Sequence, residues 1–392
     1  MRMWRAGIKV TLVRIPRPFD EPHTSAPGGN SDRVLIFGAG LAVGWGVSTH
    51  DLALPGFLAR SLSSLTGRGA DVDVIADPDI LLNDALRMLN ALPLWRYDAV
   101  VVVLGVNAAL HLDPLKIWRR DLAALLAGLE ESFRGKPVVI TSVQRIRSIP
   151  AYDSILGSIA DRQATILNRA TAGICARSTH AIFARLPDFA LPSPGRYRSP
   201  DTFAESARVV ATALAPALAI PQHQDGDSYQ PLPYDEDRAE EARQAAVDAL
   251  DLTDSELAKG IDQILALAQV SLEVPAALLT LVDHDRLLLY ASAGSSPTET
   301  PRAGSFCDLT VRQRGRMVVP DARQDDRFRD NVLVVGDPHI RFYAGFPLES
   351  NSGERLGTLC VFDTKPRQAD DIDLVELRNL ALRMQRELRT AR

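Results

Sequence analysis

One stretch with almost nothing to bury divides this chain in two. Residues 221–237 read PQHQDGDSYQPLPYDED and are rich in Pro, Asp and Gln, a composition typical of a linker. The 392 residues also exceed one ordinary hydrophobic core, since domains usually hold about 100 to 200 residues. We therefore predict an N-terminal arm at 1–32, a first domain at 33–219, a linker at 220–236 and a second domain at 237–392.

Charge and cysteine usage restrict the partners and the compartment. The net charge of -5, with Lys and Arg scattered singly, provides no basic stripe, so we expect no nucleic-acid partner. No run approaches the roughly 20 apolar residues of a membrane-spanning helix, and Lys9 and Arg14 interrupt the only signal-like start, so we expect no membrane partner. Three widely spaced cysteines form no disulfide framework, which indicates a cytoplasmic protein.

The first domain alternates short apolar runs with helical patterns. Because the runs are apolar at successive positions, we expect parallel strands covered on both faces. The expected strands are VLIF at 34–37, VDVIA at 72–76, AVVVVLG at 99–105, PVVIT at 137–141 and HAIFA at 180–184. This pattern predicts a doubly wound α/β layer, which binds ligands beyond the carboxyl ends of its strands.

The second domain has a different order of elements. The capping box from Thr253 to Glu256 predicts a first helix reaching about Leu272, and Asp370 to Arg389 predicts a closing helix. Between them we expect strands at 277–283, 286–294, 316–321, 342–350 and 357–364. Short turns at 283–285 and 351–353 read as hairpins, so the domain is predicted to be α+β with an antiparallel sheet.

Two blocks of the first domain resemble the SGNH (GDSL-type) hydrolases. In VLIFGAGLAVGWGVSTHDLALPGFLARSL, residues 38–41 (Gly-Ala-Gly-Leu) occupy the places of the family's Gly-Asp-Ser-Leu. LGVNAAL at 104–110 matches the family's Gly-x-Asn-Asp block. The resemblance covers about 33–219 and implies a flavodoxin-like doubly wound sheet, with Asn107 as a surviving oxyanion donor.

The catalytic positions of that family are degenerate here. Gly40 stands where the family has its serine, and a glycine offers no nucleophile. The best match to the family's Asp-x-x-His-Pro block is RYRSP at 196–200, which lacks both the imidazole and its carboxylate. We expect Ser199 to be the N-cap of a helix, and no catalytic residue in this domain. Ser48 and His50, with Asp51 adjacent, are weak candidates for a displaced site.

Motifs of the second domain resemble the GAF domains of bacterial signalling proteins. In family order these are SFC at 305–307, VPDA at 319–322, DxRF at 325–328, Asn331, IRFYAG at 340–345 and LGTLCV at 356–361. The resemblance spans about 235–388. It implies a sensor domain that binds a small molecule or pairs with a partner.

The concave face between the sheet and its roof loops is the expected ligand site. The candidate lining residues are Phe306, Cys307, Arg341, Phe342, Tyr343 and Cys360, together with Leu279. For Arg341 we favour an ion pair with Asp321 or Asp363 over a ligand clamp. Cys307 and Cys360 read better as buried small hydrophobes than as a redox pair. We expect no metal site, and the identity of any ligand or cofactor stays open.

These observations favour a cytoplasmic sensor with an inactive SGNH-like domain, which binds a small-molecule ligand or a protein signalling partner. GAF domains commonly pair through their first and last helices, and an apolar stripe at Leu374, Leu377 and Leu388 suits such a homodimer. The alternative is a GAF-regulated esterase or acyl hydrolase with a displaced nucleophile.

Overall fold

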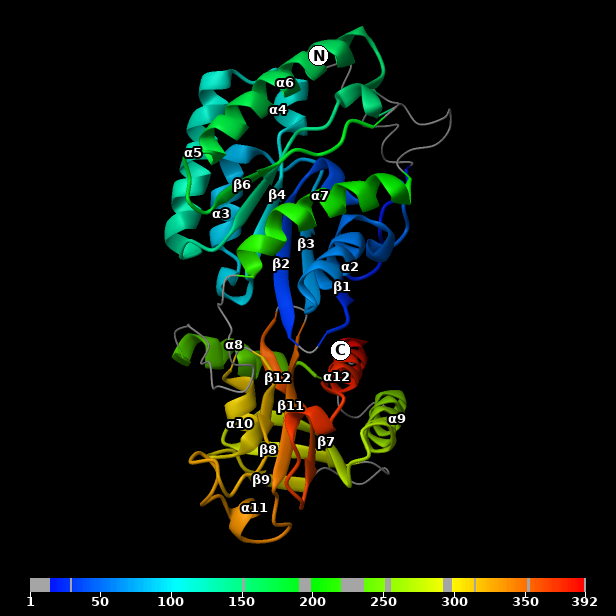
Figure 1. The fold of residues 1–392 in the computed structure, drawn as a ribbon, viewed down its shortest axis with the longest axis vertical. Helices are drawn as coiled ribbons and strands as arrows, with labels where there is room; N and C mark the ends of the chain where they lie inside the picture. Colours follow the sequence, from blue (N-terminus) through cyan, green and yellow to red (C-terminus); the bar gives the residue numbers. More distant parts are fainter. Residues whose placement is uncertain are drawn as a thin grey trace. The chain divides into compact units, whose positions relative to one another are not determined.

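The structure is a computed structural model, and it divides into two compact units, Met1–Gln222 and His223–Arg392. It describes residues 15–28, 30–149, 152–189, 199–219, 236–250, 255–291, 298–313, 315–350 and 353–390. Figure 1 shows the elements of each unit. Among these residues no helix is both long and apolar enough to span a bilayer.

The first unit is built on a six-stranded sheet in the order β1-β3-β2-β4-β5-β6. Its strands are β1 (His23–Ala26), β2 (Ser31–Gly38), β3 (Gly69–Ala76), β4 (Ala99–Val103), β5 (Val138–Thr141) and β6 (Ala181–Ala184). The five strands from β3 to β6 are parallel and follow the flavodoxin-like order, which confirms the predicted doubly wound sheet. β1 was not predicted, and it pairs antiparallel with β3 at one edge.

Helices cover both faces of this sheet because its inner strands are apolar at successive positions. Along β2, Val34 and Ile36 pack toward α2 (Leu54–Thr66) and α7 (Pro200–Leu218). Leu35 and Phe37 pack toward the opposite layer. That layer contains α3 (Leu82–Asn90), α4 (Val106–His111), α5 (Leu115–Ser132) and α6 (Ile155–Cys175). Short 3-10 turns are η1 (Gly40–Val43), η2 (His50–Leu52), η3 (Leu94–Arg96) and η4 (Ile146–Ser148).

The second unit has an antiparallel sheet in the order β10-β11-β12-β7-β8-β9, as predicted for an α+β domain. The strands are β7 (Ala276–Asp283), β8 (Arg286–Ala291), β9 (Thr298–Pro301), β10 (Met317–Val319), β11 (Phe342–Glu349) and β12 (Arg355–Asp363). The helices are α8 (Glu236–Asp248), α9 (Ser255–Ser271), α10 (Phe306–Val311), α11 (Val332–Val335) and α12 (Leu374–Thr390), with a turn η6 (Ala369–Asp371). β9 and α8 were not predicted. Thr253 of the expected capping box and Asn351 of the expected second turn lie outside the described residues.

Two separate cores lie on the two faces of this sheet. α9 and α12 pack on one face, in a core that contains Leu279, Phe342 and Leu359. On the other face α10 and the loops around it pack over Tyr343 and Cys360. Leu377 and Leu388 belong to the first core and are almost completely buried, so these two members of the expected dimer stripe pack within their own chain.

Candidate functional site

The carboxyl ends of β2, β3 and β4 meet at the place where the resemblance puts a hydrolase site. β2 ends at Gly38, where a Cβ atom would lie 2.1 Å from the Val103 carbonyl oxygen of β4, so only glycine fits. Gly40 opens η1 with φ of +59°, a left-handed conformation that favours glycine. The structure therefore brings Gly40 to the same sheet edge as the segment that begins α4, and no side chain projects from it.

Asn107 lies in the first turn of α4, and its amide already has two partners. Its Nδ2 atom donates to the carbonyl oxygens of Pro78 at 2.8 Å and Ile80 at 3.2 Å. Both amide hydrogens therefore hold the loop between β3 and α3, and neither is available to an oxyanion in this arrangement. The residue that resembles an oxyanion donor acts here as a brace for that loop.

A cavity of about 240 Å³ opens beside this brace. Its polar lining comes from α3, α4, α5 and the loops between them, and consists of Asn83, Asn107, His111, Asp113, Arg120 and Asp121. Such a volume accepts a small metabolite or a few waters. Trp118 closes one wall, and its indole Nε1 donates to Thr171 at 3.0 Å, which fixes the ring.

Ser199 stands at the N-cap of α7 with Pro200 after it, as predicted, but its side chain makes no capping hydrogen bond. Proline at the first helical position and Asp201 in the first turn therefore start this helix without the hydroxyl. Residues 196–198 of the best-matching base block lie outside the described residues.

His50 has a carboxylate partner that sequence reasoning missed. Its Nδ1 atom lies 2.7 Å from Oδ1 of Asp20, and its backbone N–H also donates to that carboxylate. Asp51, the adjacent carboxylate in the sequence, has no contact with the His50 ring among the described contacts, and Asp20 of the N-terminal segment takes that place although it is 30 residues distant. Ser48 is exposed, and no hydrogen bond joins it to His50 among the described contacts.

In the second unit, one buried cluster contains several of the predicted ligand residues. Phe306 stacks on Phe328 with ring centroids 4.0 Å apart and on Tyr343 with centroids 4.8 Å apart. The Tyr343 hydroxyl lies 3.0 Å from Oγ1 of Thr310 and 3.7 Å from Sγ of Cys307. The residues of this cluster are buried, and burial raises the pKa of Tyr343 well above its usual range.

Phe342 and Leu279 do not join this cluster. Successive side chains of a strand point to opposite faces, so Phe342 and its neighbour Tyr343 cannot line the same cavity. Phe342 packs in the core beneath α9 and α12, and Leu279 of β7 does the same. Their expected place in one ligand site with Tyr343 was wrong for this reason.

Arg341 has a structural role, although not with the predicted partners. Its Nη1 atom donates to the carbonyl oxygens of Val334 at 2.8 Å and Ile340 at 3.0 Å, which holds the end of α11. Asp321 pairs instead with Arg323 at 2.9 Å, and Asp363 pairs with Arg367 at 2.6 Å. The expected ion pair of Arg341 was therefore wrong.

A network of charges joins α8 to the turn between β7 and β8 and to α10. Arg302, just after β9, pairs with Asp308 of α10 at 2.7 Å and with Glu240 of α8. Arg243 of α8 also holds Glu240, at 2.8 Å. Burial alone would raise the pKa of Glu240, but the hydrogen bonds from Arg243 and Arg302 outweigh it and lower the pKa to about 2. This network fixes α8 to the sheet of the second unit.

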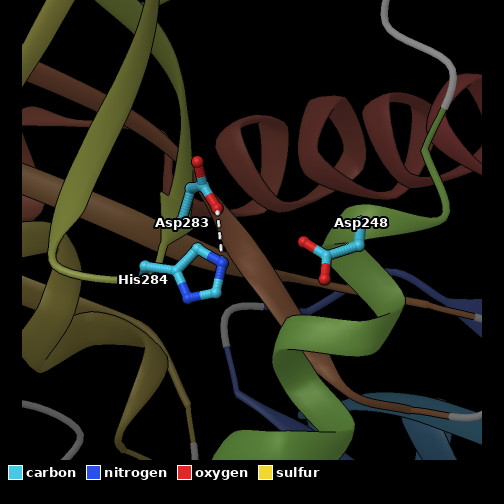
Figure 2. Close-up of side chains that lie close together, drawn as sticks. All are labelled: Asp248, Asp283 and His284. Carbon is cyan, nitrogen blue, oxygen red and sulfur yellow. Dashed lines mark ion pairs between the residues drawn. The ribbon is translucent and has the colours of Figure 1, made fainter.

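Figure 2 shows Asp248, Asp283 and His284, whose ligand atoms lie within 4.8 Å of one another. These three side chains are poorly suited to hold a metal ion, because their carboxylates already have other partners. Gln244 donates to both carboxylates, at 2.7 and 2.8 Å, and the guanidinium of Arg286 holds Asp283 at 2.8 Å. Burial acts to raise the pKa of Asp283, but the hydrogen bonds from Arg286 and Gln244 lower it. The negative charge of this carboxylate is thus already balanced within the protein. We infer a structural cluster at the hairpin turn.

Comparisons with known proteins agree with the resemblance of the second unit. Residues 256–384 match the model of the GAF domain family. A cyclic di-GMP phosphodiesterase of Pseudomonas aeruginosa is 45% identical over 135 residues, which cover 34% of this chain and 23% of that protein. The chain thus matches about a quarter of that relative's length.

Solved structures resemble each unit at low identity. For the first unit they include a family 3 carbohydrate esterase of Clostridium thermocellum, with 14% identity and a TM-score of 0.39 over 48% of this chain and 98% of that one. A carbohydrate acetylesterase of Sinorhizobium meliloti has 16% identity and a TM-score of 0.37, over 47% and 99%. A free methionine-R-sulfoxide reductase of Neisseria meningitidis has 18% identity and a TM-score of 0.29, over 42% and 98%.

Proposed function

Because residues 256–384 form a GAF domain, we propose that this chain is a cytoplasmic two-domain sensor. In this proposal the GAF unit detects a signal, and the N-terminal α/β unit is a non-catalytic scaffold or a second binding pocket. The named activity of the Pseudomonas relative supports a signalling context. That activity belongs to a protein of which only a quarter is matched here, so we do not transfer it.

One observation carries the non-catalytic role. The two positions that resemble an acyl-transfer site have no free chemical group: Gly40 lacks a side chain, and the amide of Asn107 is engaged by Pro78 and Ile80. A nucleophile and oxyanion donors aimed at the reacting carbonyl are both needed for that chemistry. We therefore assign to this edge of the sheet the binding of a small molecule in the adjoining cavity of about 240 Å³.

The ion network of α8 supports an output route from the GAF unit. Glu240 of α8 is tied through Arg302 to Asp308, which follows Cys307 directly in α10. A shift of α10 therefore changes contacts that position α8, the first helix of the unit. We propose that α8 transmits the state of the GAF cluster to the linker or to a partner protein.

We also propose a homodimer formed through the GAF helices. Since Leu377 and Leu388 are buried within the chain, the surface for pairing is provided by α9, where Leu267 is 39% exposed and Val270 is 77% exposed. Exposed apolar side chains close together on one helix are typical of helix pairing.

A second candidate function is a regulated esterase, and the Asp20–His50 pair favours it. An imidazole oriented by a carboxylate at 2.7 Å is the base half of a catalytic triad. The serine that this arrangement requires is Ser48, which has no hydrogen bond to His50 among the described contacts. The sensor is the preferred function because that contact is missing.

Hydrolysis of short-chain nitrophenyl esters by the full chain separates the two functions. The sensor proposal expects the rate in buffer alone, unchanged by Ser48→Ala, His50→Ala or Asp20→Asn. Turnover above that rate which disappears in Ser48→Ala and His50→Ala, but persists in the matched control Ser199→Ala, would establish the esterase. Native mass spectrometry of gently purified protein then tests for a retained small molecule in the sensor.

A further inference from the structure

Two cysteines far apart in the sequence lie side by side in the GAF unit. Sγ of Cys307, in α10, lies 3.9 Å from Sγ of Cys360, in β12. Cys307 is 6% exposed and Cys360 is 1% exposed, so both belong to the cluster beneath α10. The sequence favoured two separate buried hydrophobes, whereas the structure makes them a pair.

Hydroxyl groups surround these two sulfurs. The Thr280 hydroxyl lies 3.9 Å from Sγ of Cys360, and the Tyr343 hydroxyl lies 3.7 Å from Sγ of Cys307. Thr358, two residues before Cys360 on β12, is completely buried, and its hydroxyl also acts on both sulfurs. A buried hydroxyl group costs free energy unless it has a hydrogen-bond partner, so several hydroxyls gathered in one core need partners there. These groups are suited to stabilising charge on sulfur.

The hydrogen bond between the two sulfurs changes the pKa values of the two thiols in opposite directions. The bond from the Cys360 thiol outweighs burial and lowers the pKa of Cys307 below its usual range, and hydrogen bonds from Thr280, Thr358 and Tyr343 act in the same direction. The same bond raises the pKa of Cys360 well above its usual range. Cys307 is also the more exposed of the two residues, so we take it as the attacking thiolate and Cys360 as the resolving thiol.

We propose that Cys307 and Cys360 form a peroxide-reactive dithiol that closes to an internal disulfide. The Cys307 thiolate attacks one oxygen of hydrogen peroxide, the O–O bond breaks, and the departing hydroxide takes a proton to become water. Cys307 is then a sulfenic acid. The Cys360 sulfur attacks it, the S–O bond breaks, and the second water leaves with the Cys360 proton. Two thiols are oxidised to a disulfide, and one peroxide is reduced to two waters.

The reaction requires only a small local movement. A disulfide has its sulfurs about 2.0 Å apart, so the pair must approach by about 2 Å. α10 is a short helix whose N-cap Ser305 accepts from the backbone of Asp308, and drawing it toward β12 strains the contact of Asp308 with Arg302. This inference rests on the proposed sensor function and deepens it by naming a small oxidant as the signal.

Mass spectrometry of the full chain tests the chemistry without any substitution. After brief treatment with hydrogen peroxide and alkylation, we expect peptides containing Cys307 and Cys360 to be joined, with the loss of two hydrogens. Cys175 is the internal control, because it is also buried and burial raises its pKa to about 11. We expect the pair to be oxidised more than about tenfold faster than Cys175.

Two variants assign the roles within the pair. In Cys360→Ser the sulfenic acid has no resolving thiol, so dimedone should label Cys307. In Cys307→Ser dimedone should label nothing in the unit. Thermal unfolding followed by circular dichroism checks that both variants fold. Oxidation of Cys175 at the same rate as the pair, disulfides only between chains, or reduced thiols at 307 and 360 after treatment would each overturn the proposal.

Hydrogen exchange separates this proposal from the sensor function on which it rests. Formation of the disulfide with faster amide exchange in α8 supports both. An internal disulfide with unchanged exchange in α8 supports the dithiol and contradicts the output route through α8.

Discussion

Replacing Arg302 with methionine tests whether the charge network fixes α10 and α8 to the GAF sheet. Methionine keeps most of the length of the side chain and removes the guanidinium. Arg302 and Asp308 are nearly buried, with side chains 11% and 9% exposed, and they lie 2.7 Å apart. Without its partner, the Asp308 carboxylate keeps Arg312, at 3.0 Å, as its remaining ion pair among the described contacts, and its side chain is only 9% exposed.

The size of the effect follows from that burial. Removing one member of a buried ion pair costs about 3 to 5 kcal/mol, because the other charge stays desolvated. We expect the lower end, about 3 kcal/mol, since Glu240 is 41% exposed and regains water when Arg302 is lost. For a unit of the size of His223–Arg392 this corresponds to a decrease in Tm of about 6 to 12 °C.

Arg312→Met is the matched control, because Arg312 holds the same carboxylate from the solvent side. Its side chain is 45% exposed, so its loss should cost less than about 1 kcal/mol. Since the chain has two units, a single melting curve mixes two transitions. Hydrogen exchange read by mass spectrometry resolves them, and peptides of α8 and α10 should exchange about a hundredfold faster in Arg302→Met than in Arg312→Met.

Equal effects of the two substitutions would refute the reasoning, because burial would then not decide the strength of the pair. Faster exchange in α10 alone, with α8 unchanged, would show that Arg302 does not connect the two helices.

Three further predictions concern other parts of the chain. The lowered pKa of Glu240 stabilises the fold above about pH 4.5, and this stability is lost as the pH falls toward 2; Glu240→Gln should remove that part of the pH dependence in urea unfolding. Asn107→Ala should cost about 1 to 3 kcal/mol by leaving two carbonyls unpaired, whereas Ala at the exposed Asn83 should cost less than about 0.5 kcal/mol. Glutamate at both Leu267 and Val270 should convert the proposed dimer to a monomer in light scattering, and an unchanged mass would remove α9 as the interface.

The layers of both units follow from local patterns in the sequence. The run at 99–103 is apolar at every position and buried on both faces, which is why the parallel sheet was predictable. The faces of β11 were also readable, because Phe342 and Tyr343 are adjacent and strand side chains alternate. The prediction of one shared cavity ignored that alternation. α8 was missed although its Ala, Glu, Arg and Gln are strong helix formers.

Contacts that depend on the tertiary fold were beyond local patterns. Nothing near His50 in the sequence indicates Asp20, since only the folded chain brings residues 30 positions apart into contact. The 3.9 Å between Cys307 and Cys360 likewise depends on how α10 lies over β12. β1 has the sequence HTSA, which carries no strong strand signal, and its pairing depends on the exposed edge of β3.

That four-residue strand has a practical consequence for anyone shortening this chain. β1 satisfies the outer backbone groups of β3 through four aligned residues, from His23 opposite Asp73 to Ala26 opposite Ala70. A fragment trimmed to begin at residue 33 leaves that row of amides and carbonyls open to any other copy of the fragment. Open edges of this kind recruit strands from neighbouring molecules, so the trimmed fragment should form aggregates where a fragment beginning at residue 15 stays dispersed.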